Sequence, residues 1–189
     1  MTHYIFDLDG TLLNTLRAHY ETLYLLCLMK SKKKISISDI ALCNLPDLRK
    51  TLDAISEQFD LSINVGEYQT EFLKHISKVS LNITAKELAI LKSIDKSNLI
   101  LFTGRDMCTT QLLLNRFLPD IFLKVISSDQ CEKPLVPTEL KKMTDLKIYI
   151  GDCRSDLEIS QKLHATFFNI NKEVQRTELF AKLQQEQYL

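Results

Sequence analysis

The sequence predicts an α/β fold, in which helices cover both faces of a parallel sheet and an all-α module is inserted after the first strand. Three observations predict it: short apolar segments alternate with helix-like segments, capping patterns mark helix starts, and one long interval lacks any convincing strand. The chain has 189 residues, 45% of them hydrophobic, which is enough to bury a substantial core.

Five segments of four or five residues are largely apolar and are separated by helix-like sequence or loops, as expected of buried parallel strands. They are residues 4–8, 99–102, 124–128, 147–150 and 166–170. Two pairs of residues, Thr84 with Glu87 and Ser155 with Glu158, match the capping box that begins many helices. Strands that alternate with helices in this way predict a Rossmann-like parallel sheet.

About ninety residues separate the first two predicted strands, which is too many for one crossover. Apolar residues recur there at helical spacing in three segments, namely 16–27, 48–59 and 67–79, the second of them just after Pro46. Helices of this kind must bury their apolar faces against one another. We therefore expect an inserted helical module at residues 16–92 and an α/β core made of residues 1–15 and 93–189.

Composition argues against several classes of protein. Lys plus Arg and Asp plus Glu both count 24, so there is no basic excess to hold a nucleic acid. The longest apolar run, Leu23–Met29, is far shorter than the roughly 20 residues that span a bilayer. Asp7 and Asp9 interrupt the first apolar segment, unlike a secretory signal, so we expect a cytoplasmic protein without membrane contact.

Five dispersed cysteines, with no CxxC pair, argue for reduced thiols; Cys153 is singled out because it lies in a candidate catalytic loop.

Carboxylates gather at the ends of predicted strands. Asp7 and Asp9 lie two residues apart in DLDGT, so the two-residue period of a strand places them on one face. Asp152 and Asp156 follow the fourth strand in GDCRSD, and carboxyl ends of parallel strands share one edge. Two like charges about 4 Å apart repel by about 4 kcal/mol at an effective dielectric near 20. Oxygen ligands suit Mg²⁺, so the sequence predicts that the acidic pair and the GDCRSD loop hold this ion.

The same edge carries groups suited to phosphate chemistry. A carboxylate such as Asp7 can attack phosphorus to form an aspartyl-phosphate, and Asp9 is placed to move the protons. Developing charge on the phosphoryl oxygens needs donors besides a metal. The candidates are the Thr103 hydroxyl, the backbone amides beside Gly10 and Gly104, and the Lys133 ammonium.

Four motifs occur in a particular order along the chain. DLDGT (7–11), Thr103 in LFTGR, Lys133 before Pro134, and GDCRSD (151–156) resemble the motifs of the haloacid dehalogenase superfamily. Within it the chain is similar to the phosphoglycolate phosphatase-like group, which carries a helical cap after the first motif. The resemblance covers the core, about half of the chain. Many relatives have an acidic residue where this chain has Asn14.

The resemblance implies a role for each matching residue. Asp7 resembles the nucleophile and a metal ligand, and Asp9 the general acid and base, which also offers its backbone carbonyl to the metal. Thr103 and Lys133 match the residues that bind the phosphoryl group. Asp152 matches a further metal ligand. The remaining acidic residue, Asp156, is expected to support the site without binding the metal directly.

The sequence therefore predicts a Mg²⁺-dependent phosphatase that acts on a small phosphorylated metabolite, as a monomer or weak homodimer. A phosphomutase of the same superfamily is the nearest alternative, since both retain Asp9. A receiver-like signalling protein and a catalytically idle phosphate-binding protein are alternatives of another class. Arg17, His19 and Arg105 are open positions, each able either to reach an anionic substrate or to play a structural part.

Overall fold

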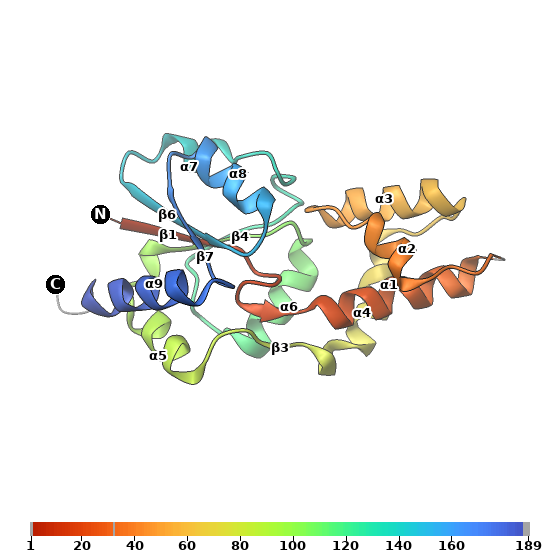
Figure 1. Ribbon diagram of the computed structural model, residues 1–189, viewed down its shortest axis with the longest axis horizontal. Helices are drawn as coiled ribbons and strands as arrows, with labels where there is room; N and C mark the ends of the chain where they lie inside the picture. The colour runs from red at the N-terminus through yellow and green to blue at the C-terminus, as the bar shows by residue number, and fades with distance from the viewer. Residues whose placement is uncertain (1, 32, 187–189) are drawn as a thin grey trace. The chain divides into compact units, whose positions relative to one another are not determined.

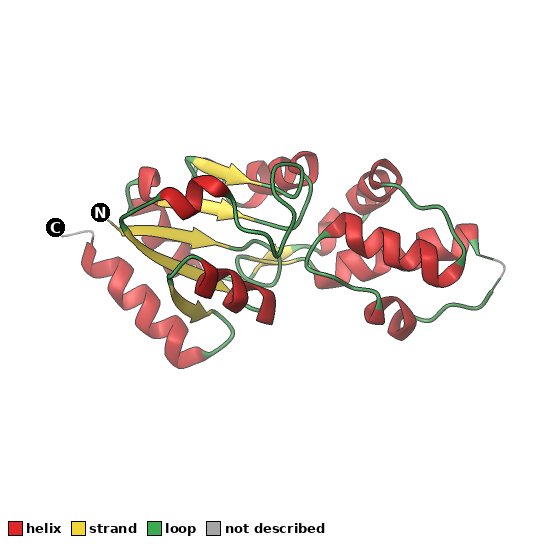
Figure 2. Ribbon diagram, turned by 90° about the horizontal axis from the view of Figure 1, so that it is seen from above, coloured by secondary structure: helices red, strands yellow, loops and turns green. Residues whose placement is uncertain are grey.

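The chain forms two compact units in a computed structural model that describes residues 2–31 and 33–186. One unit, here called the sheet unit, comprises residues 1–13 and 81–189; the other, the helical unit, comprises residues 14–80. In the described part of the chain, Figure 2 shows the main sheet in the first unit and the packed helices of the second. None of the helices described is both long and apolar enough to cross a membrane.

A five-stranded parallel sheet, in the order β5-β4-β1-β6-β7, organises the sheet unit. Its strands are β1 (Thr2–Phe6), β4 (Leu99–Phe102), β5 (Lys124–Ile126), β6 (Leu146–Gly151) and β7 (Thr166–Asn169). The predicted α/β fold and all five predicted strands are confirmed, with end points that differ by up to two residues. The strand β1 ends at Phe6, before both Asp7 and Asp9, so the two aspartates lie in the following loop rather than on one strand face.

Helices cover both faces of this sheet. They are α5 (Ala85–Ser93), α6 (Met107–Phe117), α7 (Thr138–Lys142), α8 (Arg154–Lys162) and α9 (Glu173–Glu186), with a 3₁₀ turn, η2 (Lys96–Asn98), before β4. Figure 1 shows α7 and α8 on one face and α5, α6 and α9 on the other. Alternate strand residues such as Ile5 and Ile100 pack with Leu140 of α7 and Ile159 of α8 in one buried cluster.

Of the two predicted capping boxes, one is confirmed and one is wrong. Thr84 and Glu87 form the box that begins α5. The helix α8 begins two residues before the predicted box, with Cys153 as its N-cap and Asp156 as the acidic partner, so Ser155 and Glu158 lie inside the helix. The buried Asp156 carboxylate accepts the backbone N–H groups at the helix start, which fixes that start.

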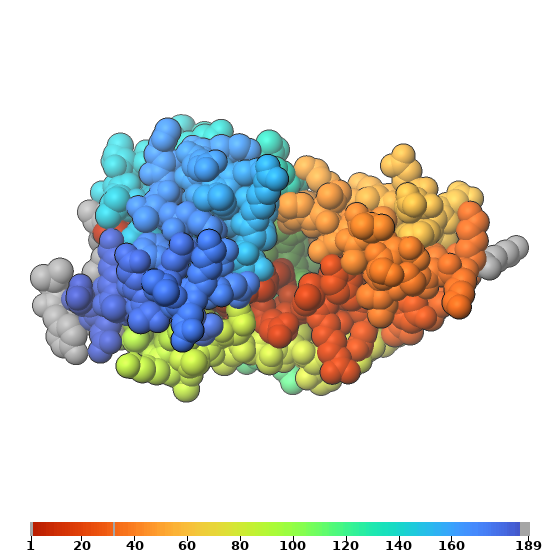
Figure 3. Space-filling model, viewed as in Figure 1, coloured from red at the N-terminus to blue at the C-terminus, as the bar shows by residue number. Residues whose placement is uncertain are grey.

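The helix α5 belongs to the sheet unit, although the sequence placed it in the helical module up to residue 92. It packs against α9, as Figures 1 and 3 show. Arg176 of α9 donates from Nε and Nη2 to the Glu87 carboxylate, at 2.6 and 2.5 Å. The sequence shows no convincing strand between this helix and the helices before it. Helical periodicity alone therefore could not assign it to a different unit.

The helical unit is built from α1 (Leu16–Lys30), α2 (Ile37–Leu42), α3 (Leu48–Phe59), α4 (Val65–Lys74) and the 3₁₀ turn η1 (Ile76–Lys78). Side-chain caps at Ser36, Asp47 and Asn64 begin α2, α3 and α4. Completely buried Tyr68 and Phe72 stack with ring centroids 5.6 Å apart in its core. The sequence showed no strand in this interval, but β2 (Leu13–Asn14) and β3 (Ser80–Leu81) pair where the chain leaves and re-enters the sheet unit.

Candidate active site

Three strands of the sheet end at the same level and deliver the predicted site residues there. Phe6 of β1 is paired with Leu101 of β4 and with Ile150 of β6. The next residue, Asp7, continues this pairing by donating its N–H to the Ile150 carbonyl at 2.9 Å. Parallel strands in this register bring the residues that follow them to one edge of the sheet.

The Asp7 carboxylate is held from both sides. It is only 6% exposed. Its Oδ1 accepts a hydrogen bond from Lys133 Nζ at 2.6 Å, and its Oδ2 accepts one from the Thr11 hydroxyl at 3.2 Å. Burial raises the pKa of Asp7 to about 8; Lys133 opposes the shift, whereas Asp156 and Asp9 add to it. The negative charge at Asp7 is therefore incompletely balanced by the protein itself.

Lys133 is a buried cation beside Asp7. It is 3% exposed, and its Nζ also donates to Asp156 Oδ1 at 2.9 Å. Its ammonium lies 5.3 Å from the ring centroid of Phe102 and 5.9 Å from that of Tyr149, distances at which aromatic rings attract a cation. Burial opposes its charge, but Asp7, Tyr149 and Asp156 raise the pKa of Lys133 well above its ordinary value. Lys133 thus carries a fixed positive charge beside Asp7.

Asp156 is completely buried and saturated with donors. Its Oδ1 accepts from Lys133 and from the Tyr149 hydroxyl at 3.2 Å, and its Oδ2 accepts the N–H groups of Asp152 and Cys153 at 3.2 and 3.3 Å. Burial alone would raise its pKa, but Lys133 and the hydrogen bonds hold the pKa of Asp156 below its usual range. Its contacts suit the supporting part expected of it, since they fix Lys133 and the start of α8.

Gly10 allows Asp152 to approach the loop after β1. Gly10 has a φ of +80°, and a Cβ atom there would lie 2.3 Å from Asp152 Oδ2. The Thr11 hydroxyl, already bonded to Asp7, lies 3.5 Å from Asp152 Oδ1. The carboxylates of Asp7 and Asp152 are therefore brought to either side of one hydroxyl.

The donor set of Asp7 and Asp152 fits a hard cation. Burial, with Asp156 adding to it, raises the pKa of Asp152 to about 6, so both carboxylates lack a full counter-charge. Ligand atoms of Asp152, Cys153 and Asp156 also lie within 4.8 Å of one another. That second set does not fit a metal, because both oxygens of Asp156 are already occupied by hydrogen bonds.

The Asp9 carboxylate is paired with an arginine. Arg105 Nη2 donates to Asp9 Oδ1 at 2.7 Å, and Arg105 Nε lies 3.1 Å from Oδ2. Asp9 remains close enough to raise the pKa of both Asp7 and Asp152 by its charge. Of the predicted set, the structure thus brings together Asp7, Asp152 and Lys133, and it gives the side chain of Asp9 a separate partner.

Thr103 lies at the end of β4 and is completely buried. Its N–H donates to the Ile126 carbonyl at 3.0 Å, and its hydroxyl oxygen accepts the N–H of Arg105 at 3.2 Å. Gly104 stands between these two residues in a bend. The TGR segment therefore forms a tight turn at the same edge of the sheet as Asp7.

Sequence reasoning missed three residues that hold this site together. Thr11 bonds to Asp7, and the Tyr149 hydroxyl bonds to Asp156. Asn82 donates from Nδ2 to the carbonyl oxygens of Gly10 and Thr11, at 2.8 and 3.1 Å, and so fixes the loop after β1. Thr11 stands in the DLDGT motif and could have been found there, whereas Asn82 is far away in sequence and carries no pattern.

Two of the open positions have partners inside the helical unit. Arg17 Nε bonds to Glu21 at 3.0 Å on the surface of α1. His19 Nδ1 lies 2.8 Å from the Tyr68 hydroxyl, and His19 Nε2 lies 3.1 Å from Asn44 Oδ1. These contacts favour a structural part for both residues.

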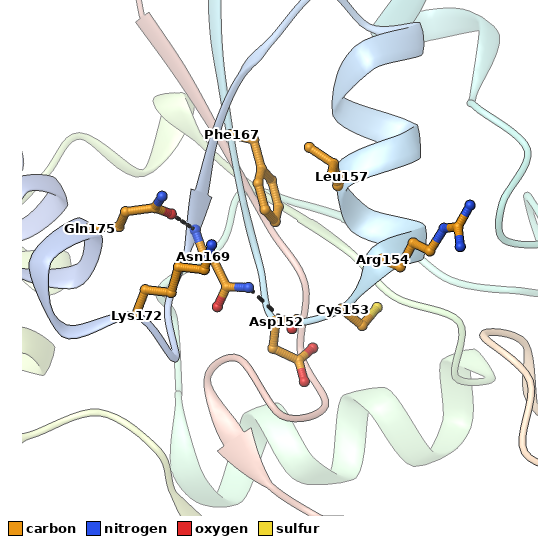
Figure 4. A pocket seen from close by; sticks show the side chains of 8 residues that line it. All are labelled: Asp152, Cys153, Arg154, Leu157, Phe167, Asn169, Lys172 and Gln175. Atoms are coloured by element: carbon orange, nitrogen blue, oxygen red, sulfur yellow. Dashed lines mark hydrogen bonds between the residues drawn. The ribbon is translucent and has the colours of Figure 1, made fainter.

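A pocket of about 430 Å³ opens beside Asp152 in the sheet unit. Its lining residues, labelled in Figure 4, are Asp152, Cys153, Arg154, Leu157, Phe167, Asn169, Lys172 and Gln175. Figure 4 shows Phe167 and Leu157 as its apolar wall and the hydrogen bonds of Asn169 on the other side. Asn169 Nδ2 donates to the Asp152 carbonyl at 3.4 Å, which ties the end of β7 to this loop.

Burial, with the charge of Asp156 adding to it, raises the pKa of the Cys153 thiol to about 12, so this cysteine stays a thiol at neutral pH.

Comparison with known proteins gives the family. Residues 4–170 match the model of the haloacid dehalogenase-like hydrolases, which covers most of the chain, so the chain belongs to this family of hydrolases. The match favours an enzyme over a signalling receiver domain. Among curated proteins, no sequence matches this chain.

Solved structures share the fold at low sequence identity. A family IA, variant 3, HAD hydrolase from Entamoeba histolytica superposes with a TM-score of 0.68 at 15% identity, covering 92% of this chain and 85% of that one. A predicted phosphoglycolate phosphatase from Haemophilus somnus gives 0.63 at 16% identity, covering 88% and 84%. A Thermotoga maritima protein assigned as a beta-phosphoglucomutase gives 0.63 at 20% identity, covering 89% and 85%. These likenesses confirm the α/β core with a helical insertion.

Proposed function

We propose that this hydrolase is a Mg²⁺-dependent phosphatase that cleaves a small phosphomonoester through an aspartyl-phosphate at Asp7. The observation that carries the proposal is the placement of the Asp7 carboxylate, which Lys133 and Thr11 hold in one orientation beside Asp152. An oriented, buried carboxylate next to a fixed ammonium and a second carboxylate suits attack on a phosphoryl group.

In the first step, an oxygen of Asp7 attacks phosphorus and the bond from phosphorus to the leaving oxygen breaks. Asp9 gives its proton to that oxygen, which leaves as an alcohol. Lys133 and the amides near Gly10 and Gly104 stabilise the charge on the phosphoryl oxygens. Thr103 binds the same group through its hydroxyl.

In the second step, water attacks phosphorus and the bond from phosphorus to Asp7 breaks. Asp9 accepts the proton of the water, which restores both residues. The carboxylates of Asp7 and Asp152, with the Asp9 carbonyl, would hold Mg²⁺. When bound, this ion neutralises charge on the phosphoryl oxygens and relieves the repulsion between the carboxylates.

The test compares the wild-type protein with Asp7→Asn on 4-nitrophenyl phosphate, with Mg²⁺ and with EDTA. We expect the wild-type rate to depend on Mg²⁺ and to fall by more than about 10³-fold in Asp7→Asn. Asp53→Asn, an exposed aspartate on α3, is the matched control and should keep full activity. Mass spectrometry of acid-quenched enzyme should find phosphate on the peptide that contains Asp7. Activity that survives in Asp7→Asn would exclude this mechanism, and no turnover on a broad panel would favour an idle phosphate-binding protein.

Product analysis separates the phosphatase from a phosphomutase. A phosphatase releases inorganic phosphate from every substrate that it turns over. A mutase would return the phosphoryl group to a sugar phosphate and release little phosphate. We propose the phosphatase because water is the simpler acceptor, and a panel of sugar phosphates, nucleotides and phosphoglycolate would identify the substrate.

A further inference from the structure

Asn82 binds successive carbonyl groups of the loop after β1. Its side-chain Nδ2 donates to the Gly10 carbonyl at 2.8 Å and to the Thr11 carbonyl at 3.1 Å. Its backbone N–H donates to the next carbonyl, that of Leu12, at 2.8 Å. One residue from a distant part of the sequence therefore fixes the backbone of residues 10–12.

Asn82 is itself anchored by the helix α9. Arg176 Nη2 donates to the Asn82 carbonyl oxygen at 3.0 Å. The same guanidinium is paired with the Glu87 carboxylate of α5, so its own position is fixed by a second helix. The residue that holds the loop after β1 thus has a fixed backbone, and its side chain reaches the loop from a defined direction.

The loop places one buried hydroxyl between two carboxylates. Thr11 is completely buried, and its Oγ1 lies 3.2 Å from Asp7 Oδ2 and 3.5 Å from Asp152 Oδ1. At Gly10, a Cβ atom would lie 2.3 Å from Asp152 Oδ2, so the loop backbone is also packed closely against this carboxylate. Because Asn82 holds the carbonyls of these same loop residues, releasing them would move the hydroxyl out of its place.

We propose that Asn82 is a positioning residue for the metal site. By holding the loop after β1, it keeps the Thr11 hydroxyl between Asp7 and Asp152 and so sets the separation of these carboxylates. This inference rests on the proposed function, in which both carboxylates hold Mg²⁺. The ion demands near-ideal octahedral geometry, so its affinity depends on how its ligands are spaced. Residues that orient metal ligands typically change the affinity by about 10- to 100-fold.

The first test measures metal binding without substrate. Asn82→Leu keeps roughly the size of the side chain and removes its N–H donors. The probe is Mn²⁺, which takes the same oxygen ligands as Mg²⁺ and whose free concentration can be read by electron paramagnetic resonance. We expect Kd for Mn²⁺ to rise by about 10-fold with an unchanged number of sites. Unfolded protein would lower the number of sites rather than their affinity, so a loss of stability cannot imitate this result.

A matched variant gives this comparison its control. Asn115→Leu replaces an exposed asparagine on α6 and should leave Kd for Mn²⁺ unchanged. If Asn82→Leu bound Mn²⁺ as tightly as the wild-type protein, the proposal would be overturned and the phosphatase would stand. If the wild-type protein bound no Mn²⁺ and turned over phosphate esters in EDTA, the metal site and this inference would be overturned together.

The second test asks whether Asn82 acts through the Thr11 hydroxyl. Thr11→Val removes the hydroxyl, keeps the shape of the side chain, and should also raise Kd for Mn²⁺ by about 10-fold. Adding Asn82→Leu to Thr11→Val should then raise Kd by less than about twofold further, because the group that Asn82 places is already lost. If the two separate losses multiply in the double variant, Asn82 does not act through this hydroxyl and the proposal is overturned.

Discussion

The two units of this protein use charged side chains in different ways. The sheet unit buries five charged side chains near the carboxyl ends of its strands, none more than 6% exposed: Asp7, Arg105, Asp106, Lys133 and Asp156. Among its described residues the helical unit buries two charged side chains, Asp47 and Glu71, while ion pairs such as Lys30 with Glu67 lie at its surface. Buried charges are costly, so their concentration at the strand ends supports the proposal that the active site lies there.

The same difference appears in the glycines. Gly10 in the sheet unit has a positive φ and lies against a carboxylate, whereas Gly66 of the helical unit sits in the first turn of α4. In the loop after β1, only glycine permits the close approach of Asp152 to the backbone. In the helical unit, the start of α4 is fixed by its Asn64 cap and does not require a glycine. Each difference between the units can be tested by a matched pair of substitutions.

The largest expected effect on stability comes from Lys133→Met. Loss of the ammonium leaves Asp7 and Asp156 buried without their common partner, and breaking a buried ion pair costs about 3 to 5 kcal/mol. Urea denaturation followed by circular dichroism would measure this loss. Lys162→Met, at an exposed position on α8, is the control. If Lys133→Met were as stable as the wild-type protein, the charges at this edge would have to be less buried than the structure has them.

Gly10→Ala should have the next largest effect. An alanine at a φ of +80° costs about 1 to 2 kcal/mol, and its Cβ would push Asp152 away from Thr11. We expect a loss of about 2 kcal/mol together with weaker Mg²⁺ binding, measured by calorimetry. Gly66→Ala should change stability by less than about 1 kcal/mol and leave the metal affinity unaltered. Equal effects of the two substitutions would contradict the close approach at Gly10.

The sequence predicted the site better than it predicted the contacts inside it. Asp7, Thr103 and Asp152 follow neighbouring strands, so strand order and register were enough to bring them together. The pairing of Asp9 with Arg105 was not predictable, because it depends on the backbone of the TGR turn. The capping residue of α8 was misassigned for a similar reason. The Asp156 carboxylate both accepts the N–H groups at the start of α8 and bonds to Lys133, whereas the sequence pattern favoured Ser155, a more common capping residue.

A smaller effect is expected where α5 meets α9. Burial alone would raise the pKa of Glu87, but hydrogen bonds from Arg176 and Thr84 hold it below its ordinary value of 4.5. A lowered pKa in the folded state adds stability above pH 4.5, and this stability is lost as the pH falls through the folded-state pKa. Glu87→Gln should therefore cost about 1 kcal/mol at pH 7, after screening by solvent, and nearly nothing in strong acid. Glu57→Gln, an exposed position on α3, should show no such pH dependence. A cost for Glu87→Gln that stays constant down to strong acid would argue against an ionised pair.

The smallest effect is expected from Lys30→Ala in the helical unit. Lys30 Nζ lies 2.5 Å from a Glu67 oxygen, but both side chains are open to solvent, and ion pairs of this kind contribute little because water screens them. We expect no resolvable change in the urea midpoint. Phe72→Ala, at a completely buried position on α4, should cost about 3 to 5 kcal/mol and shows that the measurement responds to this unit. If Lys30→Ala lowered the free energy of unfolding as much as Lys133→Met does, burial would not explain why the buried pairs of Lys133 stabilise the protein more than the exposed Lys30–Glu67 pair.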